Sequence, residues 1–580
     1  MPDVTEAPAR RRRSNPPAGS KNARSMSRKK RCESRAAALR SIRDPYLLHW
    51  RDISSLLMPR TGMFLLADRS RGGRKNQAIY DGTGTHSLRI TAAGIMTGSS
   101  YPARPWFGVT TADVSMRKRS AVRRWTDLLT ESIRSVLQRS NAYRALHQVY
   151  EEMVAYGTGA CLVLPDAEDI VRLHPMTAGE YMLATDAKGR VNTMFRELDM
   201  TVSQVVEEFG YYQCSRSVRD RWDNGDLDTS VAVMHVIEPR EYYDPSKRDT
   251  TNMPWRSVHY EIGSSEDMVL RESGYRKFPV LAPRWRIEAN SAYGGSPGMD
   301  ALGSVAQLQQ EQHRKSQGID LQTLPPVQAP LELQNGEVNL LPGGVTYHNA
   351  AGANSGVREV FASRVPLGDL TADIVEVRQR IRDAFFTDLF LLVTNSTGDK
   401  TVPEIQELQQ EKLMVLGPVI ENVDTELLKP LIELVFDELV ARSMVPPAPE
   451  EMHGQALEIE FVSMLAQAQK AIGTNTIDRF IGNLMAVGKV KPEVFDKFDA
   501  YEWVDRAAEM LGVPAAMIVP TDDALKVAEA RAKAQAAAQQ AESVGVAAKA
   551  VRDFAAAPTD APNALTGLDA VGLFSGLGSP

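Results

Sequence analysis

The stretch that most constrains the fold is residues 403–443, because its pattern predicts a helix too long for a compact domain. Large apolar residues recur there every three or four positions, from Ile405 to Leu439. At about 1.5 Å per residue, a continuous helix of this length would reach about 60 Å. We therefore expect an elongated subunit.

The start and the interior of this helix are marked by specific residues. Thr401 stands three residues before Glu404, which is the spacing of a capping box, and Pro403 falls in the first turn, where no N–H is needed. Pro418 and Pro430 lie inside the pattern, where each removes a backbone hydrogen bond and crowds the preceding turn. The sequence therefore predicts a helix that begins near residue 403 and is kinked at both prolines.

A loop of small polar side chains, residues 393–402, precedes this helix. Its central residues are Thr394, Asn395, Ser396, Thr397, Gly398, Asp399 and Lys400. With one cation, one anion and no large apolar side chain between its terminal valines, the loop would add little to a core. Two interpretations stay open, namely a mobile element that touches phosphates weakly and an ordinary exposed connection between helices.

Charge is distributed unevenly along the 580 residues. The first 40 residues contain twelve lysines and arginines against three acidic residues and so carry +9. The whole chain carries −6, so the remaining residues carry −15. A basic segment such as residues 1–35 is typical of solvated disorder, and weak contact with nucleic acid or an acidic partner is the alternative.

The other periodic stretches predict an α+β protein that is mainly helical. Helices are expected at about 46–58, 118–153, 201–209, 299–318, 370–392 and 462–512, and an alanine-rich helix follows. A buried strand is expected at 160–164, a hairpin at 180–197 and a β-rich module at 231–290. The last 25 residues have the composition of a flexible tail. No run of 18 uncharged apolar residues occurs, so no membrane span is expected.

One enzyme motif matches literally but fails chemically. Gly294-Gly-Ser-Pro-Gly298 has the G-x-S-x-G form of a nucleophile elbow. The residue after the nucleophile must donate its backbone N–H to the oxyanion, and Pro297 has none. We therefore interpret the motif as a turn that starts a helix.

No other motif indicates catalysis. Gly398-Asp-Lys-Thr401 lacks the glycine before lysine that a phosphate-binding loop needs, so an ATP-driven motor is not indicated. The nine histidines lack metal-site spacing, and the three cysteines are widely separated. We expect no enzyme activity, no cofactor and no metal ion.

In its order of parts the chain resembles the portal, or head-to-tail connector, proteins of tailed bacteriophages, closest to the short-tailed podovirus type. The resemblance covers about residues 36–540. The stretches that carry it are Arg51-Asp-Ile-Ser-Ser-Leu-Leu-Met-Pro-Arg60, Ala155-Tyr-Gly-Thr-Gly-Ala-Cys161, Phe278-Pro-Val-Leu-Ala-Pro-Arg-Trp285, Tyr293-Gly-Gly-Ser-Pro-Gly298, Thr401-Val-Pro-Glu-Ile405 and Leu416-Gly-Pro418.

The resemblance implies an elongated subunit with wing, stem, clip and crown regions that forms a ring. Mapped onto this chain, the expected parts are a disordered basic tail (1–35), the first part of the wing (36–200), a stem helix region (201–230), a β-rich clip (231–296), a stem helix (297–320), wing strands (321–369), wing helices (370–443) with the tunnel loop (393–402), the crown (444–520), the alanine-rich helix (521–557) and a flexible tail (558–580).

The resemblance also implies function and partners. The ring, generally of twelve subunits, would sit at one capsid vertex of the virion after assembly in the host cytoplasm. Double-stranded DNA would be packaged and ejected through its centre, and the tunnel loop, residues 394–400, would face that DNA. The terminase motor, tail adaptor proteins, and capsid and scaffolding proteins would be its partners. The alternative is a virion scaffold or adaptor protein that conducts no DNA.

Overall fold

The structure is a computed structural model. It describes residues 27–64, 78–113, 116, 119–244, 246–247, 249–323, 327–328, 358–359, 366–391, 416–452, 457–461 and 521–555, with a few positions between 484 and 519. The chain forms two compact units, one of Met1–Arg117 with Ala121–Pro492 and one of Lys118–Ser120 with Glu493–Pro580. The described structure is α+β and mostly helical, as expected. In the described part of the chain, no helix is both long and apolar enough to cross a lipid bilayer.

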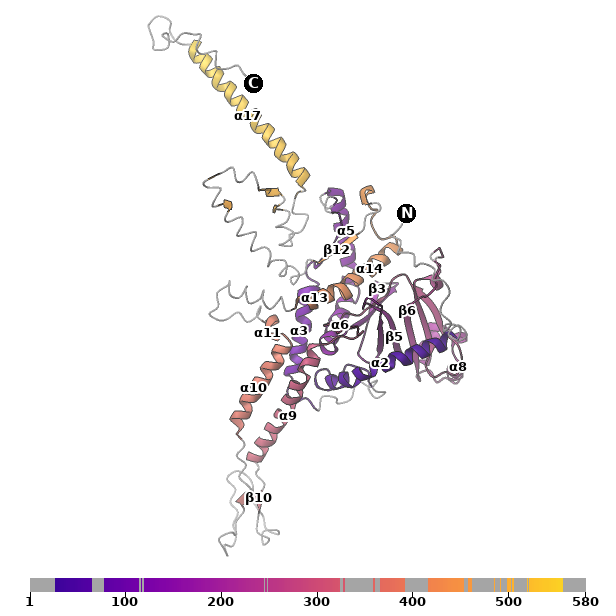
Figure 1. The fold of residues 1–580 in the computed structure, drawn as a ribbon. Coiled ribbons are helices and arrows are strands. Elements are labelled where there is room, and N and C mark those ends of the chain that lie inside the picture. Colours follow the sequence, from indigo (N-terminus) through magenta and orange to yellow (C-terminus); the bar gives the residue numbers. More distant parts are fainter. Residues whose placement is uncertain are drawn as a thin grey trace. The chain divides into compact units, whose positions relative to one another are not determined.

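Figure 1 shows the helices and strands in the order of the chain. The helices are α2 (Arg28–Leu56), α3 (Thr83–Ser99), α5 (Ser120–Arg139), α6 (Ala142–Tyr156), α7 (Val202–Phe209), α8 (Arg216–Asp223), α9 (Pro297–Thr323), α10 (Leu367–Ala384), α11 (Thr387–Leu391), α13 (Gly417–Val423), α14 (Lys429–Ala441) and α17 (Thr521–Ala555). The strands are β1 (Phe107–Thr111), β2 (Ala160–Asp166), β3 (Ile170–Met176), β4 (Tyr181–Thr185), β5 (Val191–Thr201), β6 (Ser230–Pro239), β7 (Trp255–Glu261), β8 (Arg271–Tyr275), β9 (Val280–Leu281), β10 (Val327–Gln328), β11 (Arg358–Glu359) and β12 (Leu457–Phe461).

The largest sheet is antiparallel and has the order β4-β5-β6-β7-β8. Side chains of β6 alternate between its faces, as the two-residue period of a strand requires. Val231 and Val233 pack in a cluster with α7 and α8, whereas Met234 and Val236 pack in a second cluster with α2. The sheet is therefore covered by α2 on one face and by the short helices on the other.

This sheet changes the expected division of the chain. Residues 231–296 were expected to form a β-rich module separate from 36–200. Instead, β6 pairs with β5 along Met194–Thr201, so the strands of both segments form one sheet. The region 201–230 was expected to supply a stem helix, but α7 and α8 have eight residues each and pack on this sheet. The expected hairpin is confirmed as β4–β5, and the helix expected at 201–209 is confirmed as α7, where Thr201 forms a capping box with Gln204.

The helix α2 corrects the prediction of a disordered tail through residue 35. Its first half packs Cys32, Ala36 and Leu39 against the sheet, and its second half places Trp50 and Ile53 in the main core. The basic residues of its first half bind partners on distant strands and loops. They form the pairs Arg28 with Glu272, Arg35 with Glu238 (2.8 Å) and Arg40 with Glu197 (2.9 Å), and the Lys29 ammonium donates to the carbonyls of Ser264 and Glu266. Residues 28–35 are therefore an ordered part of the fold, and residues 1–26 lie outside the described residues.

These contacts predict different outcomes for two truncations. Removal of residues 1–26 leaves every described contact of α2 in place, so thermal unfolding should match that of the full chain. Removal of residues 1–40 uncovers the apolar sheet face that Cys32, Ala36 and Leu39 bury, and should lower the free energy of unfolding by about 2–4 kcal/mol. Equal melting temperatures for both truncations would show that α2 adds nothing to this cluster.

The predicted helix 118–153 is two helices, α5 and α6. Its predicted apolar face is confirmed, because Val122, Trp125, Leu129, Ile133, Val136, Leu137, Leu146 and Val149 are all buried. The break lies at Asn141, whose side-chain amide donates to the Leu173 carbonyl (2.7 Å) and accepts from the Leu173 N–H (2.9 Å). A side chain that pairs with a strand backbone in this way fixes the corner between the helices.

The long helix is described from Gly417 to Ala441 and has three parts, α13, a π turn (Asp424–Leu428) and α14. Both prolines stand in first turns, Pro418 in α13 and Pro430 in α14, so the wide π turn accommodates the N–H missing at Pro430. The expected kink at Pro418 is instead the first turn of a helix. The expected start of the helix at residues 403–415 lies outside the described residues.

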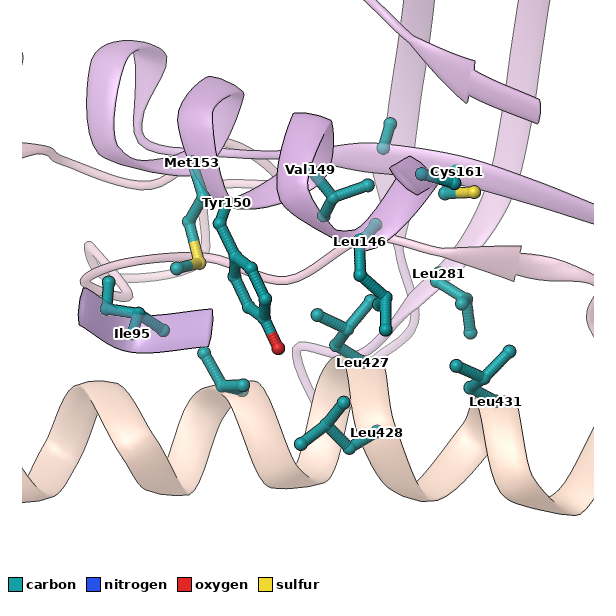
Figure 2. Packing of buried hydrophobic residues seen from close by; sticks show 14 of the residues in the cluster. Ile95, Leu146, Val149, Tyr150, Met153, Cys161, Leu281, Leu427, Leu428 and Leu431 are labelled. Atoms are coloured by element: carbon teal, nitrogen blue, oxygen red, sulfur yellow. The ribbon is translucent and has the colours of Figure 1, made fainter. Parts of the chain in front are cut away.

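The π turn lies in the centre of the main core. Figure 2 shows Leu427 beside Leu146 of α6 and Leu431 beside Leu281 of β9, and Leu428 belongs to the same buried cluster. These three leucines have no exposed surface. The long helix is thus held by its apolar residues against α6 and the small sheet β3-β2-β9.

The remaining elements differ from expectation in two places. The predicted helix 370–392 is α10 followed by α11, and the break lies at Phe386, which has a positive φ of 54°. The strand β12, within the expected crown, pairs antiparallel with β1. The alanine-rich helix is confirmed as α17, and its Val527, Val544 and Val546 are exposed.

Candidate functional site

The glycine-rich stretches 155–161 and 293–298 lie against each other, backbone to backbone. Gly157 has a φ of 83°, and a Cβ atom there would lie 1.9 Å from the Gly294 carbonyl oxygen, so only glycine fits. The Gly294 N–H donates to Thr158 Oγ1 (2.9 Å), and the Trp285 N–H donates to the Gly157 carbonyl (2.9 Å). Three stretches that carry the family resemblance therefore meet at one junction.

Ser296 is a structural residue of this junction and not a nucleophile. Its hydroxyl donates to the Ala155 carbonyl (2.8 Å) and accepts from the Met299 N–H (3.1 Å) in the first turn of α9. The residue is fully buried. The interpretation of the G-x-S-x-G sequence as a turn that starts a helix is confirmed.

Arg284 and Glu426 connect this junction to the long helix. The Arg284 guanidinium and backbone N–H both donate to the Glu426 carboxylate, with Nε 3.1 Å from Oε1. The guanidinium also donates to the carbonyls of Ser291 (3.0 Å) and Gly189 (2.9 Å). Only 2% of the Arg284 side chain is exposed, so this cation depends on these partners for its solvation. One buried arginine thereby links the π turn, the β4–β5 turn and the segment before α9.

A second polar network fixes the helix pair α9–α10 to the core. The Arg378 guanidinium on α10 donates to Asp81 Oδ2 through Nε (2.9 Å) and Nη2 (2.7 Å). From α9, Gln309 Oε1 accepts the N–H groups of Tyr80 and Asp81, and Gln312 donates to Asp81 Oδ2. Burial acts to raise the pKa of Asp81, but hydrogen bonds from Thr83 and Arg378 outweigh it and lower the pKa. Asp81 therefore stays ionised and holds both helices at the start of α3.

The two helices also share an apolar face. Ile374, Val377 and Ile381 of α10 are buried in the same cluster as Val305 and Leu308 of α9. Figure 1 shows the pair running side by side away from the core toward β10. The strands β10 and β11 pair antiparallel in the segment that joins the two helices. Sequence alone predicted the buried face of α10 correctly but did not show that α9 is its partner.

An open groove of about 630 Å³ lies between α9 and the first turns of α10. Its lining residues are Arg314, Gln317, Gly318, Leu321, Pro366, Asp369, Leu370 and Asp373. Leu321, Pro366 and Leu370 make part of this lining apolar, and Arg314, Asp369 and Asp373 give it charges of both signs.

Two buried carboxyl groups give the core a pH dependence. Burial raises the pKa of Glu152 and of Asp424 to about 7. Because these pKa values lie above the usual 4.5 and 3.8, the folded chain binds more protons than the unfolded chain between pH 4 and 7. Both groups therefore lower the free energy of unfolding as the pH rises through this window.

Glu152→Gln should remove the contribution of the Glu152 carboxyl group to the pH dependence of the free energy of unfolding. The Glu152 carboxylate accepts from Thr177 Oγ1 (2.7 Å) and the Ala178 N–H (3.0 Å), and an amide can keep both contacts by donating to the hydroxyl. The free energy of unfolding of the variant, relative to that of the wild type, should rise by up to about 3 kcal/mol between pH 5 and pH 8, as measured by urea unfolding. Glu151→Gln, at a less buried neighbour, is the control, and a constant difference between Glu152→Gln and wild type across this range would contradict the prediction.

The predicted DNA-contacting residues 394–400 lie outside the described residues, and so does the rest of the loop 393–402. The residues that sequence analysis missed are the polar ones, chiefly Asp81, Arg284, Gln309, Arg378 and Glu426. The one signal that could have found any of them is Arg284, which lies inside a stretch that carries the resemblance. Among the described residues, no group of three or more His, Cys, Asp or Glu is placed to hold a metal ion.

Comparison with known proteins decides the family. Residues 29–519 match the family described as "Bacteriophage head to tail connecting protein". The chain belongs to this connector family. It is 47% identical over 544 residues to the "Probable portal protein" of Bordetella phage BPP-1, covering 94% of this chain and 98% of that protein. It is 40% identical over 543 residues to the "Portal protein" of Salmonella phage epsilon15, covering 93% and 98%.

Two solved structures share only a distant likeness with this connector chain. A chain from the "Virion of native gene transfer agent (GTA) particle" is 12% identical, with a TM-score of 0.32, 74% of this chain covered and 99% of that chain. A chain from the "Neck of empty GTA particle computed with C6 symmetry" is 12% identical, with a TM-score of 0.35 and coverages of 75% and 90%.

Membership of the connector family confirms the resemblance found in the sequence. The chain is a structural, non-enzymatic portal protein of the phage virion, located at the portal vertex of the capsid. The described polar networks hold helices together, which agrees with a structural role.

Proposed function

We propose that the chain forms a closed ring, of twelve subunits in the implied arrangement, through which double-stranded DNA is packaged and ejected. The observation that carries this proposal is the α9–α10 pair, an antiparallel arm that leaves the core and is fixed to it by Asp81 and Arg378. Copies of such an arm, related by rotation, would stand side by side around a channel.

The fold supports a revised assignment of the portal regions. In this proposal α9 and α10 are the stem, and residues 324–366, which join them, are the clip, where the terminase motor and tail adaptor proteins dock. The groove beside Arg314 and Asp373 would lie next to that docking place. The sheet β4–β8 with α2 and the long helix would form the wing, facing capsid and scaffolding proteins. The segment that ends in α17 would form the crown.

Net charge is compatible with DNA sliding through the ring. Double-stranded DNA carries one negative charge per about 1.7 Å of its axis, and a conduit that bound each phosphate tightly would stall it. The chain after residue 40 carries −15, so a bore of neutral or acidic character would let DNA slide. Tight, salt-insensitive binding of DNA to purified rings would contradict this part of the proposal.

The loop 393–402 is proposed as the tunnel loop that contacts DNA weakly. Replacing residues 395–399 with a shorter Gly-Ser linker should leave rings that assemble and bind the motor, while DNA retention and completed packaging fall. A Gly-Ser linker of the original length is the control that separates loop length from loop chemistry. Unchanged packaging and retention with the short linker would make the loop a plain connection between helices.

End-on electron microscopy of the purified chain tests the proposed ring directly. We expect closed rings with a central hole that admits double-stranded DNA. Assemblies without a hole, or monomers at all concentrations, would favour the alternative of a non-conducting scaffold or adaptor. The same preparations should show no ATP turnover with Mg²⁺.

A further inference from the structure

Two buried histidines are stacked on the face of the large sheet that α7 and α8 cover. His235 of β6 and His259 of β7 are partners across the strand pair, and their ring centroids lie 3.9 Å apart. Only 3% of His235 and 6% of His259 is exposed. His235 Nε2 lies 3.0 Å from Ser257 Oγ, whereas His259 Nδ1 is buried without a hydrogen-bond partner among the described residues. Two imidazoles buried in such close contact would repel each other if both took up a proton.

The strands on either side of this pair bring further cations to it. In the register of the sheet, Arg196 of β5 is the partner of His235, and Arg271 of β8 is the partner of His259. Cross-strand partners point to the same face, so these four basic side chains form one row across four strands. The two arginines are charged already, so a proton on either histidine places a third cation in the row.

The acidic groups near this row already have partners. These pairs are Glu180 with Arg196 Nε (2.6 Å), Glu208 of α7 with Arg271 (2.8 Å), and Glu261 of β7 with the Ser215 N–H (2.7 Å). Tyr275 of β8 lies on the same face, and burial raises the pKa of its hydroxyl, which therefore stays neutral. None of these three carboxylates is unpaired, so a proton on His235 or His259 gains no new counter-ion from them.

Burial and the neighbouring basic groups keep both imidazoles neutral. Burial, and then the charge of Arg271, lower the pKa of His259 to about 3. Burial, and then His259 and Arg196, lower the pKa of His235 well below its usual 6.5. Once the rings are exposed to water they regain their ordinary pKa, so below pH 6.5 an opened form binds more protons than the closed form. The free energy needed to open this part of the sheet is therefore largest above pH 6.5 and decreases as the pH falls.

The row lies at the border between two hydrophobic clusters. On β6, Val233 precedes His235 and packs with α7 and α8, whereas Ile237 follows it and packs in the main core. Phe209, the last residue of α7, lies against His259 with ring centroids 5.2 Å apart. Hydration of a charged His259 therefore requires the end of α7 to move away from the sheet.

We propose that the His235–His259 stack is a pH-sensitive switch. When the imidazoles take up protons, the cap formed by α7 and α8 separates from the sheet while the main core stays folded. Separation exposes the apolar cluster beneath the cap, which consists of Val202, Val205, Val206, Cys214, Val218, Val231, Val233 and Leu270. The main core responds in the opposite sense, because protonation of Glu152 and Asp424 raises its free energy of unfolding. This inference does not depend on the proposed ring.

The three cysteines make the switch measurable, because each is buried in a different cluster. Cys214 lies under the cap, where its thiol donates to the Gly210 carbonyl (3.2 Å). Cys32 lies between α2 and the opposite face of the same sheet, and Cys161 lies in the main core. The reaction of each thiol with 4,4′-dithiodipyridine can be located by mass spectrometry. Its rate, divided by the rate in urea at the same pH, measures how far the surrounding cluster opens.

The first experiment compares these relative rates in the full chain at pH 7 and pH 5. The relative rate of Cys214 should rise at least about tenfold at pH 5, because an exposed imidazole of ordinary pKa is mostly protonated there. Cys32 and Cys161 should stay protected. A rate at Cys214 that does not change with pH would overturn the proposal. Equal increases at all three cysteines would also overturn it, because they report unfolding of the whole chain.

The second experiment removes both titrating groups. His235→Gln keeps an amide that can bond to Ser257, and His259→Phe keeps an aromatic ring where Nδ1 has no partner. In this double variant Cys214 should be as protected at pH 5 as at pH 7, and a rise as large as in the wild type would overturn the proposal. His174→Gln is the matched control, because His174 of β3 is half-buried and burial lowers its pKa too. This control should respond to pH as the wild type does.

The single variant His259→Phe decides the outcome if the double variant already exposes Cys214 at pH 7. It removes one of the two protons and leaves the contact of His235 with Ser257 in place. The rise in the relative rate of Cys214 between pH 7 and pH 5 should then be several times smaller than in the wild type. An undiminished rise would show that the stack does not control the cap.

Discussion

Leu427→Asp is expected to destabilise the main core by about 5 kcal/mol and to prevent ring assembly. Leu427 is fully buried in the π turn of the long helix and lies close to Leu146 and Leu281 (Figure 2). An aspartate there would either bury an unpaired charge or take up a proton at a cost in free energy. It would also lose the apolar contacts of leucine. Thermal unfolding and light scattering would measure both effects.

The matched control for this substitution is Val440→Asp on the same helix. Val440 is 46% exposed, so its aspartate stays hydrated, and the melting temperature should change little. Equal effects of the two substitutions would mean that the buried face of the long helix has been assigned wrongly. The comparison therefore tests the face and not merely the tolerance of the helix to aspartate.

Periodicity predicted the buried faces well because that signal is local. The apolar positions expected on α5, α6 and α10 are buried, and on the described part of the long helix all of them are buried except Leu434, which is partly exposed. The helix expected from Thr201 is also present. Helix ends were less predictable, because they depend on contacts with other elements. Asn141 breaks one predicted helix by pairing with Leu173, and Phe386 breaks another by adopting a positive φ.

The largest differences between the predicted and the observed fold come from contacts between residues that lie far apart in the sequence, ion pairs above all. A run of lysines and arginines near the N-terminus has the composition of a disordered tail, yet half of it is helical. Arg28, for example, pairs with Glu272 on β8, more than 200 positions away. The sequence around either residue does not predict this partner. The same reason explains why the strands 231–275 could not be joined to the hairpin 180–197 from sequence.

The candidate site was predicted in part. The glycine stretches 155–161 and 293–298 were singled out from sequence, and the structure shows why glycine is needed where they touch. Their contact, and the polar networks that fasten α9, α10 and the long helix, join residues as much as 297 positions apart. The proposed DNA-contacting loop stays a prediction.

Removing either member of the Arg284–Glu426 pair should lower the free energy of unfolding by about 3–5 kcal/mol. Arg284→Met leaves the Glu426 carboxylate without its main donor, and Glu426→Leu leaves a buried guanidinium without its counter-ion. In the double variant the free energy of unfolding should fall by clearly less than the sum of the two single decreases, because no unpaired charge remains. A double-mutant cycle on urea unfolding curves measures this coupling.

A neighbouring ion pair supplies the control and shows why burial decides the outcome. Arg286 and Asp300 approach to 3.1 Å, as close as many buried pairs, but both side chains are 52% exposed. Water already solvates each charge there, so either single substitution should cost less than about 1 kcal/mol with little coupling. If the Arg284 cycle gave a coupling as small as this one, Arg284 would not be the element that holds the π turn to the glycine junction. The long helix would then depend on its leucines alone, and the single charge variants should still form rings.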